Sequence, residues 1–179
     1  MISGLLTGLR AISLNDIPHL LEWRNYPEFR QFFREHRELA IEDQIRWYEE
    51  TVQKNETVRM FAITELSTNE LIGACGLCYI DFRNQSADFS IYIGKDKLYI
   101  DDNFAPDVAS TLLQFGFEQL NLNRVWAEIY SIDDKKQEFF ENIGFTIEGR
   151  HRQSRWVNNQ WVDSLYYAML KDEYGSNRS

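Results

Sequence analysis

The chain alternates between apolar and polar residues in Ala87-Asp-Phe-Ser-Ile-Tyr-Ile93. This period of two predicts a strand with one face toward a core. Residues 104–120 instead carry apolar side chains three and four positions apart, which is the period of a helix. Their apolar stripe is wide, so we expect this helix to pack against a sheet. The two segments together predict a sheet covered by a helix on one face.

The segments on both sides extend this pattern. Six further strands are predicted, with turn signals between some of them, and helical periods occur in two earlier stretches and one later one. The predicted strands are 5–12, 58–64, 71–80, 87–93, 124–130, 145–152 and 161–170, and the predicted helices begin near Ile17 and cover 41–52, 104–120 and 133–142. This order predicts an α+β fold with a mixed, mostly antiparallel sheet of about seven strands and about four flanking helices.

Length and composition limit the classes of protein. The chain has 179 residues, the size of one domain, which we expect over residues 1–174 with a disordered tail at 175–179. Its net charge of −9 argues against a nucleic-acid binder or a partner of anionic membranes. Cys75 and Cys78 lie in an apolar run without other ligands nearby, so we expect neither a disulfide nor a metal site. Without a signal peptide or a long apolar run, the sequence predicts a cytoplasmic protein.

The order of elements and several short motifs resemble the GNAT superfamily of acyl-CoA-dependent N-acetyltransferases, in particular its RimJ/RimL-like branch, over residues 8–173. The motifs are Leu9-Arg-Ala11, Leu21-Glu-Trp-Arg-Asn25, Ala87-Asp-Phe-Ser-Ile-Tyr-Ile-Gly94, Phe115-Gly-Phe-Glu-Gln-Leu120, Asn121-Leu-Asn-Arg-Val125 and Glu141-Asn-Ile-Gly-Phe145. The resemblance implies an enzyme that transfers acetyl from acetyl-CoA to the primary amine of a small molecule. An amino-sugar nucleotide is one such acceptor, and a protein N-terminus is an alternative.

The same resemblance implies where acetyl-CoA binds. Backbone groups of Ile91 and Ile93 would bond its pantetheine arm, and its pyrophosphate would lie on the loop Asp101, Asp102, Asn103, Phe104 and Ala105 at a helix start. Family members usually carry glycines there, whereas this loop has two aspartates. A like charge about 4 Å from a phosphate repels it by roughly 4 kcal/mol at an effective dielectric near 20. Aspartates also stabilise helix starts. We favour a helix cap with outward-turned carboxylates over an impaired cofactor loop.

The resemblance further implies catalytic positions. Asp133 and Phe140 stand where family members usually carry an Asn near pantetheine and a Tyr general acid. Asp88 is the first candidate base and Glu128 the second, while Ser131 is a candidate hydroxyl at the same strand end. Surface strand carboxylates and a hydroxyl bonded to the backbone are the ordinary structural alternatives. Because usual family residues are replaced, a non-catalytic GNAT-like binding module is the competing hypothesis.

Two basic, aromatic clusters are predicted to flank the acceptor groove. They contain Arg30, Arg34, His36 and Arg37 in the first segment, and Arg152 and Trp156 in the second. Arginine forks suit phosphate and aromatic faces suit a base ring, which favours a nucleotide-linked acceptor. The alternative is that neighbouring glutamates neutralise the first cluster and that the second protects a sheet edge. A homodimer is common in the branch that the chain resembles, and the exposed late strands could pair between chains.

Overall fold

One sheet of eight strands organises the computed structural model, which describes residues 1–176. The strands are β1 (Ile2–Ser3), β2 (Thr7–Ala11), β3 (Arg59–Glu65), β4 (Leu71–Asp81), β5 (Ser86–Ile93), β6 (Arg124–Tyr130), β7 (Thr146–Val157) and β8 (Gln160–Leu170). Their order is β1-β2-β3-β4-β5-β6-β8-β7. Only the β5–β6 pair is parallel, so this sheet is mixed and mostly antiparallel, as predicted.

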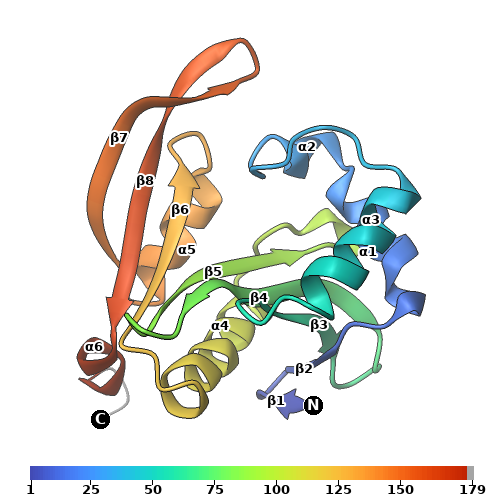
Figure 1. The fold of residues 1–179 in the computed structure, drawn as a ribbon, viewed down its shortest axis with the longest axis horizontal. Coiled ribbons are helices and arrows are strands. Elements are labelled where there is room, and N and C mark those ends of the chain that lie inside the picture. The colour runs from blue at the N-terminus through green and yellow to red at the C-terminus, as the bar shows by residue number, and fades with distance from the viewer. Residues whose placement is uncertain (177–179) are drawn as a thin grey trace.

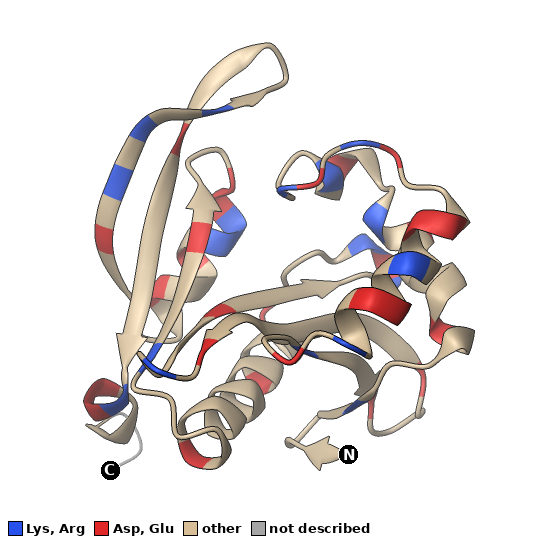
Figure 2. Ribbon diagram, in the orientation of Figure 1, with Lys and Arg blue, Asp and Glu red and all other residues tan. Residues whose placement is uncertain are grey.

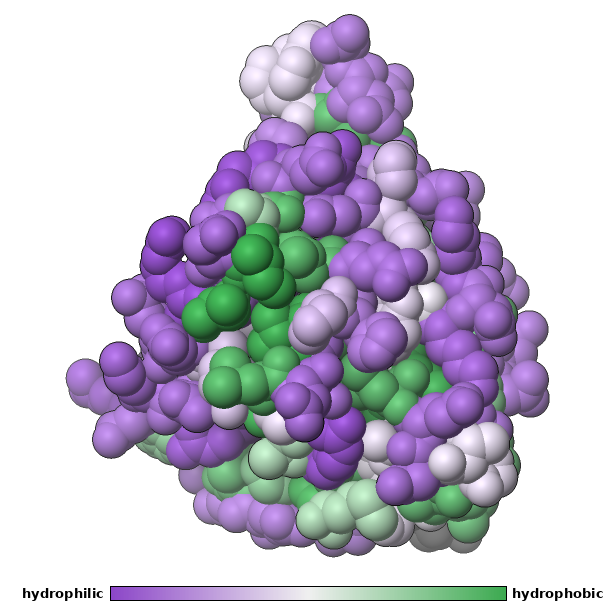
Figure 3. Space-filling model, turned by 90° about the vertical axis from the view of Figure 1, so that its right-hand side faces the viewer, coloured by the Kyte–Doolittle hydropathy of each residue, from purple (hydrophilic) through white to green (hydrophobic). Residues whose placement is uncertain are grey.

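Helices lie on both faces of the sheet (Figure 1). Within residues 1–176 the α-helices are α1 (Ile17–Arg24), α2 (Pro27–Arg30), α3 (Ile41–Trp47), α4 (Phe104–Gln114), α5 (Asp134–Asn142) and α6 (Lys171–Ser176). The π-helical segments Tyr48–Val52 and Phe115–Gln119 continue α3 and α4. Figure 3 shows the side of the molecule that carries α1 and α3, where an apolar patch is bordered by hydrophilic side chains. None of these helices is long and apolar enough to cross a membrane.

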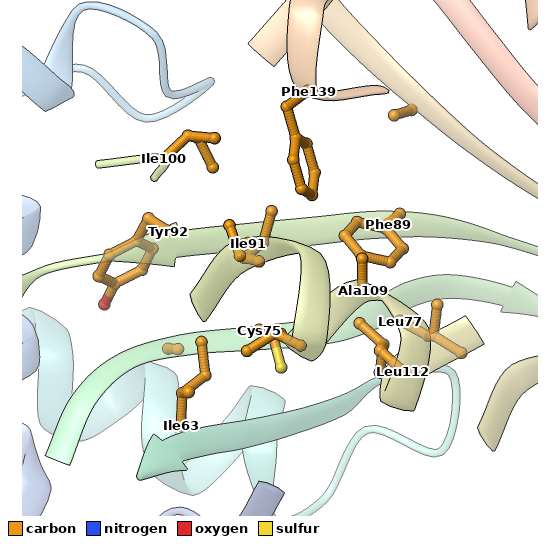
Figure 4. Close-up of a cluster of buried hydrophobic side chains, with 14 of the residues drawn as sticks. Ile63, Cys75, Leu77, Phe89, Ile91, Tyr92, Ile100, Ala109, Leu112 and Phe139 are labelled. Atoms are coloured by element: carbon orange, nitrogen blue, oxygen red, sulfur yellow. The ribbon is translucent and has the colours of Figure 1, made fainter. Parts of the chain in front are cut away.

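The helix α4 packs on the centre of the sheet. Its residues Ala109 and Leu112 are at most 1% exposed and face Cys75, Leu77 and Ile91 (Figure 4). Burying a leucine or isoleucine side chain of this kind stabilises the fold by about 1.5–3 kcal/mol. The wide apolar stripe therefore does cover a sheet face, and the predicted strand and helix of this region are confirmed.

The structure differs from the predicted element count in short segments. It adds β1, α2 and α6 to the predicted strands and helices, and the first two have only two and four residues. Segments this short have no measurable apolar period. Gly175 and Ser176, which the sequence assigns to a disordered tail, complete α6, whereas residues 177–179 of that tail lie outside the described part of the chain.

Candidate active site

The site forms where β5 and β6 part. The two strands pair only from Ser86 opposite Arg124 to Asp88 opposite Trp126, and β6 then continues beside β8 (Figure 1). Past Asp88, no described residue of β6 pairs with β5. This divergence is the one that the family resemblance implies for the pantetheine arm.

Only one of the two isoleucines on β5 keeps its backbone groups for a ligand. The N–H of Ile93 donates to the carbonyl of Tyr99, and the Tyr99 N–H donates back, both at 2.8 Å. The prediction that Ile93 offers these groups is therefore wrong. Ile91 lies two residues earlier, so its N–H and carbonyl point to the same side of the strand, where β6 has already turned away. Ile91 stays the predicted pantetheine contact.

A buried pair of carboxylates lies at this divergence and is bridged by Arg34. The Arg34 guanidinium donates to Asp88 Oδ2 at 2.6 Å and to Glu128 Oε2 at 3.2 Å. Glu128 Oε1 accepts further bonds from Arg155 and Ser164, each at 2.7 Å. Both Glu128 oxygens are thus occupied. Asp88 Oδ1, by contrast, has no hydrogen-bond partner among residues 1–176.

The two carboxylates differ in pKa because their partners differ. Burial raises the pKa of Asp88 to about 6, and the single arginine beside it offsets only part of that effect. Burial also acts on Glu128, but the hydrogen bonds from Ser164 and Arg155 outweigh it and hold its pKa below the ordinary value. Near neutral pH, Asp88 is therefore the carboxylate suited to exchange a proton, while Glu128 stays ionised and anchors two arginines.

Two predicted site residues, Ser131 and Asp133, are engaged in structural contacts. The Ser131 hydroxyl accepts a hydrogen bond from the backbone N–H of Asp163 at 3.2 Å. This contact agrees with the alternative in which the hydroxyl bonds a nearby backbone group. Asp133 is 2% exposed; its carboxylate caps α5 by accepting the Lys136 N–H and takes a 2.5 Å bond from the Tyr99 hydroxyl. Burial raises the pKa of Asp133. Both Asp133 oxygens are occupied, so its assignment to the cofactor is corrected to a helix cap.

Phe140 is part of the core and not of the cofactor surface. Its ring is 1% exposed, with ring centroids 4.9 Å from Phe145, 5.1 Å from Phe139 and 5.6 Å from Phe89. A ring so enclosed offers no surface to a ligand. Its assignment to the cofactor site is therefore corrected to core packing.

We expect Phe140→Tyr to destabilise the protein by about 1–3 kcal/mol, because the added hydroxyl is buried among aromatic rings without a partner. Urea unfolding measures this change, and Phe82→Tyr, at a position that is 56% exposed, is the matched control. An unchanged free energy of unfolding in Phe140→Tyr, together with faster acetyl transfer, would contradict the burial of this ring.

The pyrophosphate loop is occupied by its own aspartate. Asp101 Oδ2 accepts the N–H groups of Asn103 at 3.0 Å and Phe104 at 2.9 Å, and Asp101 Oδ1 accepts that of Ala105 at 2.9 Å. The cap is confirmed, but the Asp101 carboxylate turns inward onto the helix, which corrects the expected outward orientation. Asp102 is exposed. A hollow of about 780 Å³ adjoins this loop, so space for the nucleotide exists beside donors that are already bonded.

The segments that carry the two basic clusters lie opposite each other, and Figure 2 shows basic residues on both. Only part of each predicted cluster lines the groove between them. A hollow of about 820 Å³ lies between the α2 segment and the β7–β8 hairpin and is lined by Arg30, Arg34, His36, Arg155 and Trp156, among others. Asn158 at the hairpin tip donates to Gln31 at 2.9 Å and closes one side. Arg37 and Arg152 lie elsewhere, because Arg37 borders a different cavity and Arg152 a separate surface hollow.

Carboxylates neutralise most of these arginines. Arg34 and Arg155 pair with the buried acids, Arg30 lies 3.7 Å from Glu38, and Arg37 pairs with Glu35 at 3.2 Å. This pairing supports the alternative in which glutamates balance the first cluster. The groove therefore offers a phosphate less positive charge than the sequence suggests.

Sequence reasoning missed Arg155, Arg24 and Lys136. Arg155 holds Glu128, whereas Arg24 and Lys136 line the cavity that Arg37 borders. Lys136 lies three residues after Asp133 on α5, and no motif distinguishes it from exposed helix lysines. The alternation in β7 gave no signal for Arg155 either, since this strand is irregular between His151 and Arg155.

Comparisons with known proteins agree with this geometry. Residues 7–146 match the family model described as acetyltransferase (GNAT) domain. The uncharacterized N-acetyltransferase p20 of Bacillus licheniformis is 29% identical over 114 residues, which are 64% of this chain and 63% of that protein, so the match spans just under two thirds of p20. The spermidine N(1)-acetyltransferase of Vibrio cholerae is 24% identical over 166 residues, 93% of this chain and 94% of that protein.

A solved structure gives the same fold. The crystal structure of spermidine N-acetyltransferase from Vibrio cholerae in complex with CoA and spermine has a TM-score of 0.85 at 22% identity, and the match covers 94% of this chain and 98% of that one. This likeness supports the mixed α+β architecture. Because the family model covers well over half of the residues, the chain belongs to the acetyltransferase (GNAT) domain family.

Proposed function

We propose that the protein transfers the acetyl group of acetyl-CoA to the primary amine of a small molecule, and that Asp88 takes the proton of that amine. The observation that carries this proposal is the position of Asp88 at the divergence of β5 and β6. One Asp88 oxygen is fixed by Arg34, and the other has no described partner. A fixed carboxylate with a pKa of about 6 is ionised at neutral pH and can accept a proton.

The reaction balances with the residues present. The amine nitrogen attacks the thioester carbon, the C–N bond forms, and the proton on nitrogen passes to Asp88 Oδ1. The C–S bond then breaks and CoA leaves as a thiolate. Phe140 has no proton to give, but a thiol has an ordinary pKa of about 8.5, so the thiolate leaves readily. It takes a proton from solvent, and Asp88 releases the proton of the amine to solvent, which restores the carboxylate. Glu128 contributes by positioning Arg34 and Arg155.

Release of CoA thiol on addition of an amine tests this proposal. The panel contains spermidine, because a relative is named for it, together with an amino-sugar nucleotide, amino acids and a peptide with a free N-terminus. We expect amine-dependent thiol release with at least one small molecule. Micromolar binding of acetyl-CoA by calorimetry without release for any amine would instead support the binding-module alternative. Preference for the peptide would favour a protein acceptor.

Four sequence-based expectations stay predictions. They are the cytoplasmic location, the RimJ/RimL-like branch, a homodimer through the late strands, and the absence of nucleic-acid partners. The amino-sugar nucleotide also stays a proposed acceptor only, since the groove arginines that would bind its phosphates are paired with carboxylates.

A further inference from the structure

A cavity of about 480 Å³, distinct from the hollows beside α2 and α4, opens on the face of β5 that carries Asp88. It lies between α1, α3 and the sheet, and Ser90 and Tyr92 form part of its wall. Residues 88, 90 and 92 point to the same face because side chains alternate along a strand. Phe33 lines both this cavity and the groove that contains Arg34. The cavity therefore adjoins the proposed base.

Charges at one end of this cavity are internally paired. Arg37 contacts Glu35 at 3.2 Å and Asp43 at 2.9 Å, and Arg46 lies 3.5 Å from Asp43. These four ions balance one another within the chain, and the exposed Glu50 adds one further negative charge to the lining at this end. This end therefore offers no net positive charge to an anionic ligand.

Two cations in the same cavity have no such partner. Neither the Arg24 guanidinium nor the Lys136 ammonium makes an ion pair or a hydrogen bond with any residue that the structure describes. Both lie against Phe33, whose ring centroid is 3.9 Å from Arg24 Cζ and 5.7 Å from Lys136 Nζ. Burial lowers the pKa of both groups.

The nearest acidic groups do not supply the missing partner. Asp88 and Asp133 act on Lys136 through their charge, and Glu35 acts on Arg24 in the same way, but none of the three lies within ion-pair distance of its cation. Arg34 binds Asp88, and Tyr99 with the start of α5 binds Asp133. Arg24 and Lys136 are half-buried, and neither has a bonded anion, which is unfavourable for a cation partly removed from water. Two such cations lining one cavity mark a place for an anion from outside the chain.

We infer that the acetyl acceptor carries an anionic group, a carboxylate or a phosphate, that binds between Arg24 and Lys136 while its amine faces Asp88. This inference rests on the proposed acetyl transfer. The guanidinium of Arg24 suits a planar or tetrahedral oxyanion, and the Lys136 ammonium adds a point charge beside it. A polyamine is cationic along its length and would meet two like charges at this position.

Three matched amines test the anionic requirement. Ethanolamine, L-serine and O-phosphoethanolamine share an aminoethanol framework and differ in having no anion, a carboxylate or a phosphate; spermidine is the polycationic comparison. We expect kcat/KM for at least one anionic amine to exceed that for ethanolamine and spermidine by about tenfold or more, as expected for hydrogen bonds to charged groups. Serine and phosphoethanolamine together tell which anion is used.

Variants of the two cations assign the effect to this cavity. Lys136→Met and Arg24→Gln should raise KM for the anionic amine about tenfold or more and change that for ethanolamine by less than about threefold. Lys54→Met and Arg83→Gln, at exposed positions, are the matched controls. Calorimetry with acetyl-CoA checks that each variant is folded.

The outcomes separate this inference from the proposed function. Faster transfer to spermidine or ethanolamine than to both anionic amines overturns the inference and leaves acetyl transfer intact. Equal losses for anionic and neutral amines in the two variants also overturn it. Absence of transfer to all four amines and to the wider panel overturns both.

Discussion

Replacing Asp88 with asparagine is expected to lower kcat for acetyl transfer by about a hundredfold or more, the usual contribution of a positioned base. The amide in Asp88→Asn keeps an oxygen for the hydrogen bond from Arg34, but it cannot accept a proton from the amine. Steady-state kinetics at saturating acetyl-CoA measure the effect. KM for the amine should change little, because Asp88 acts on the proton and not on the bulk of the acceptor.

The pH dependence of the rate distinguishes a base from a structural carboxylate. Because the pKa of Asp88 is raised to about 6 and the ionised form accepts the proton, the rate should rise as the pH increases through 6 and then level off. Asp88→Asn should lack this rise. Asp172→Asn, at an exposed position on α6, removes the same charge and should behave as the wild type. An unchanged rate and pH profile in Asp88→Asn would mean that solvent, and not Asp88, takes the proton of the amine.

Long periodic segments made most of the fold predictable. The strand predicted at 124–130 coincides with β6, and the helix predicted at 133–142 differs from α5 by its cap, Asp133. The spacing of apolar residues follows from which side chains are buried, and this spacing can be read from the sequence alone. The strand β7 runs five residues past its predicted end because its outer part pairs with β8 in a hairpin that carries few buried side chains.

The site was only partly predictable, because its side chains are paired across long sequence distances. Alternation along the strands identified Asp88 and Glu128, but nothing local indicated that Arg34, 54 residues from Asp88, joins the two. Arg34 was expected to bind the acceptor, whereas the structure places it between the acids. Charge pairing of this kind depends on tertiary packing, and so does the inward turn of Asp101.

Removing the Asp101 side chain is expected to strengthen the binding of CoA. The family resemblance assigns the CoA pyrophosphate to the N–H groups of residues 103–105, and the Asp101 carboxylate holds these same donors. CoA must therefore displace a cap that contributes about 1 kcal/mol and also overcome the repulsion between the carboxylate and phosphate charges. We expect Asp101→Ala to lower the Kd for CoA by about tenfold or more, a gain of about 1.4 kcal/mol, measured by calorimetry.

Two comparisons restrict this effect to the pyrophosphate. Pantetheine lacks that group, so its affinity should be the same for wild type and Asp101→Ala. Asp102→Ala removes an exposed carboxylate next to the cap, and it should improve CoA binding far less because Asp102 holds none of the three donors. Equal gains from the two variants would indicate a general charge effect. An unchanged Kd in Asp101→Ala would mean that CoA binds without using the N–H groups at the start of α4. The contacts to CoA would then have to come from β5, including Ile91.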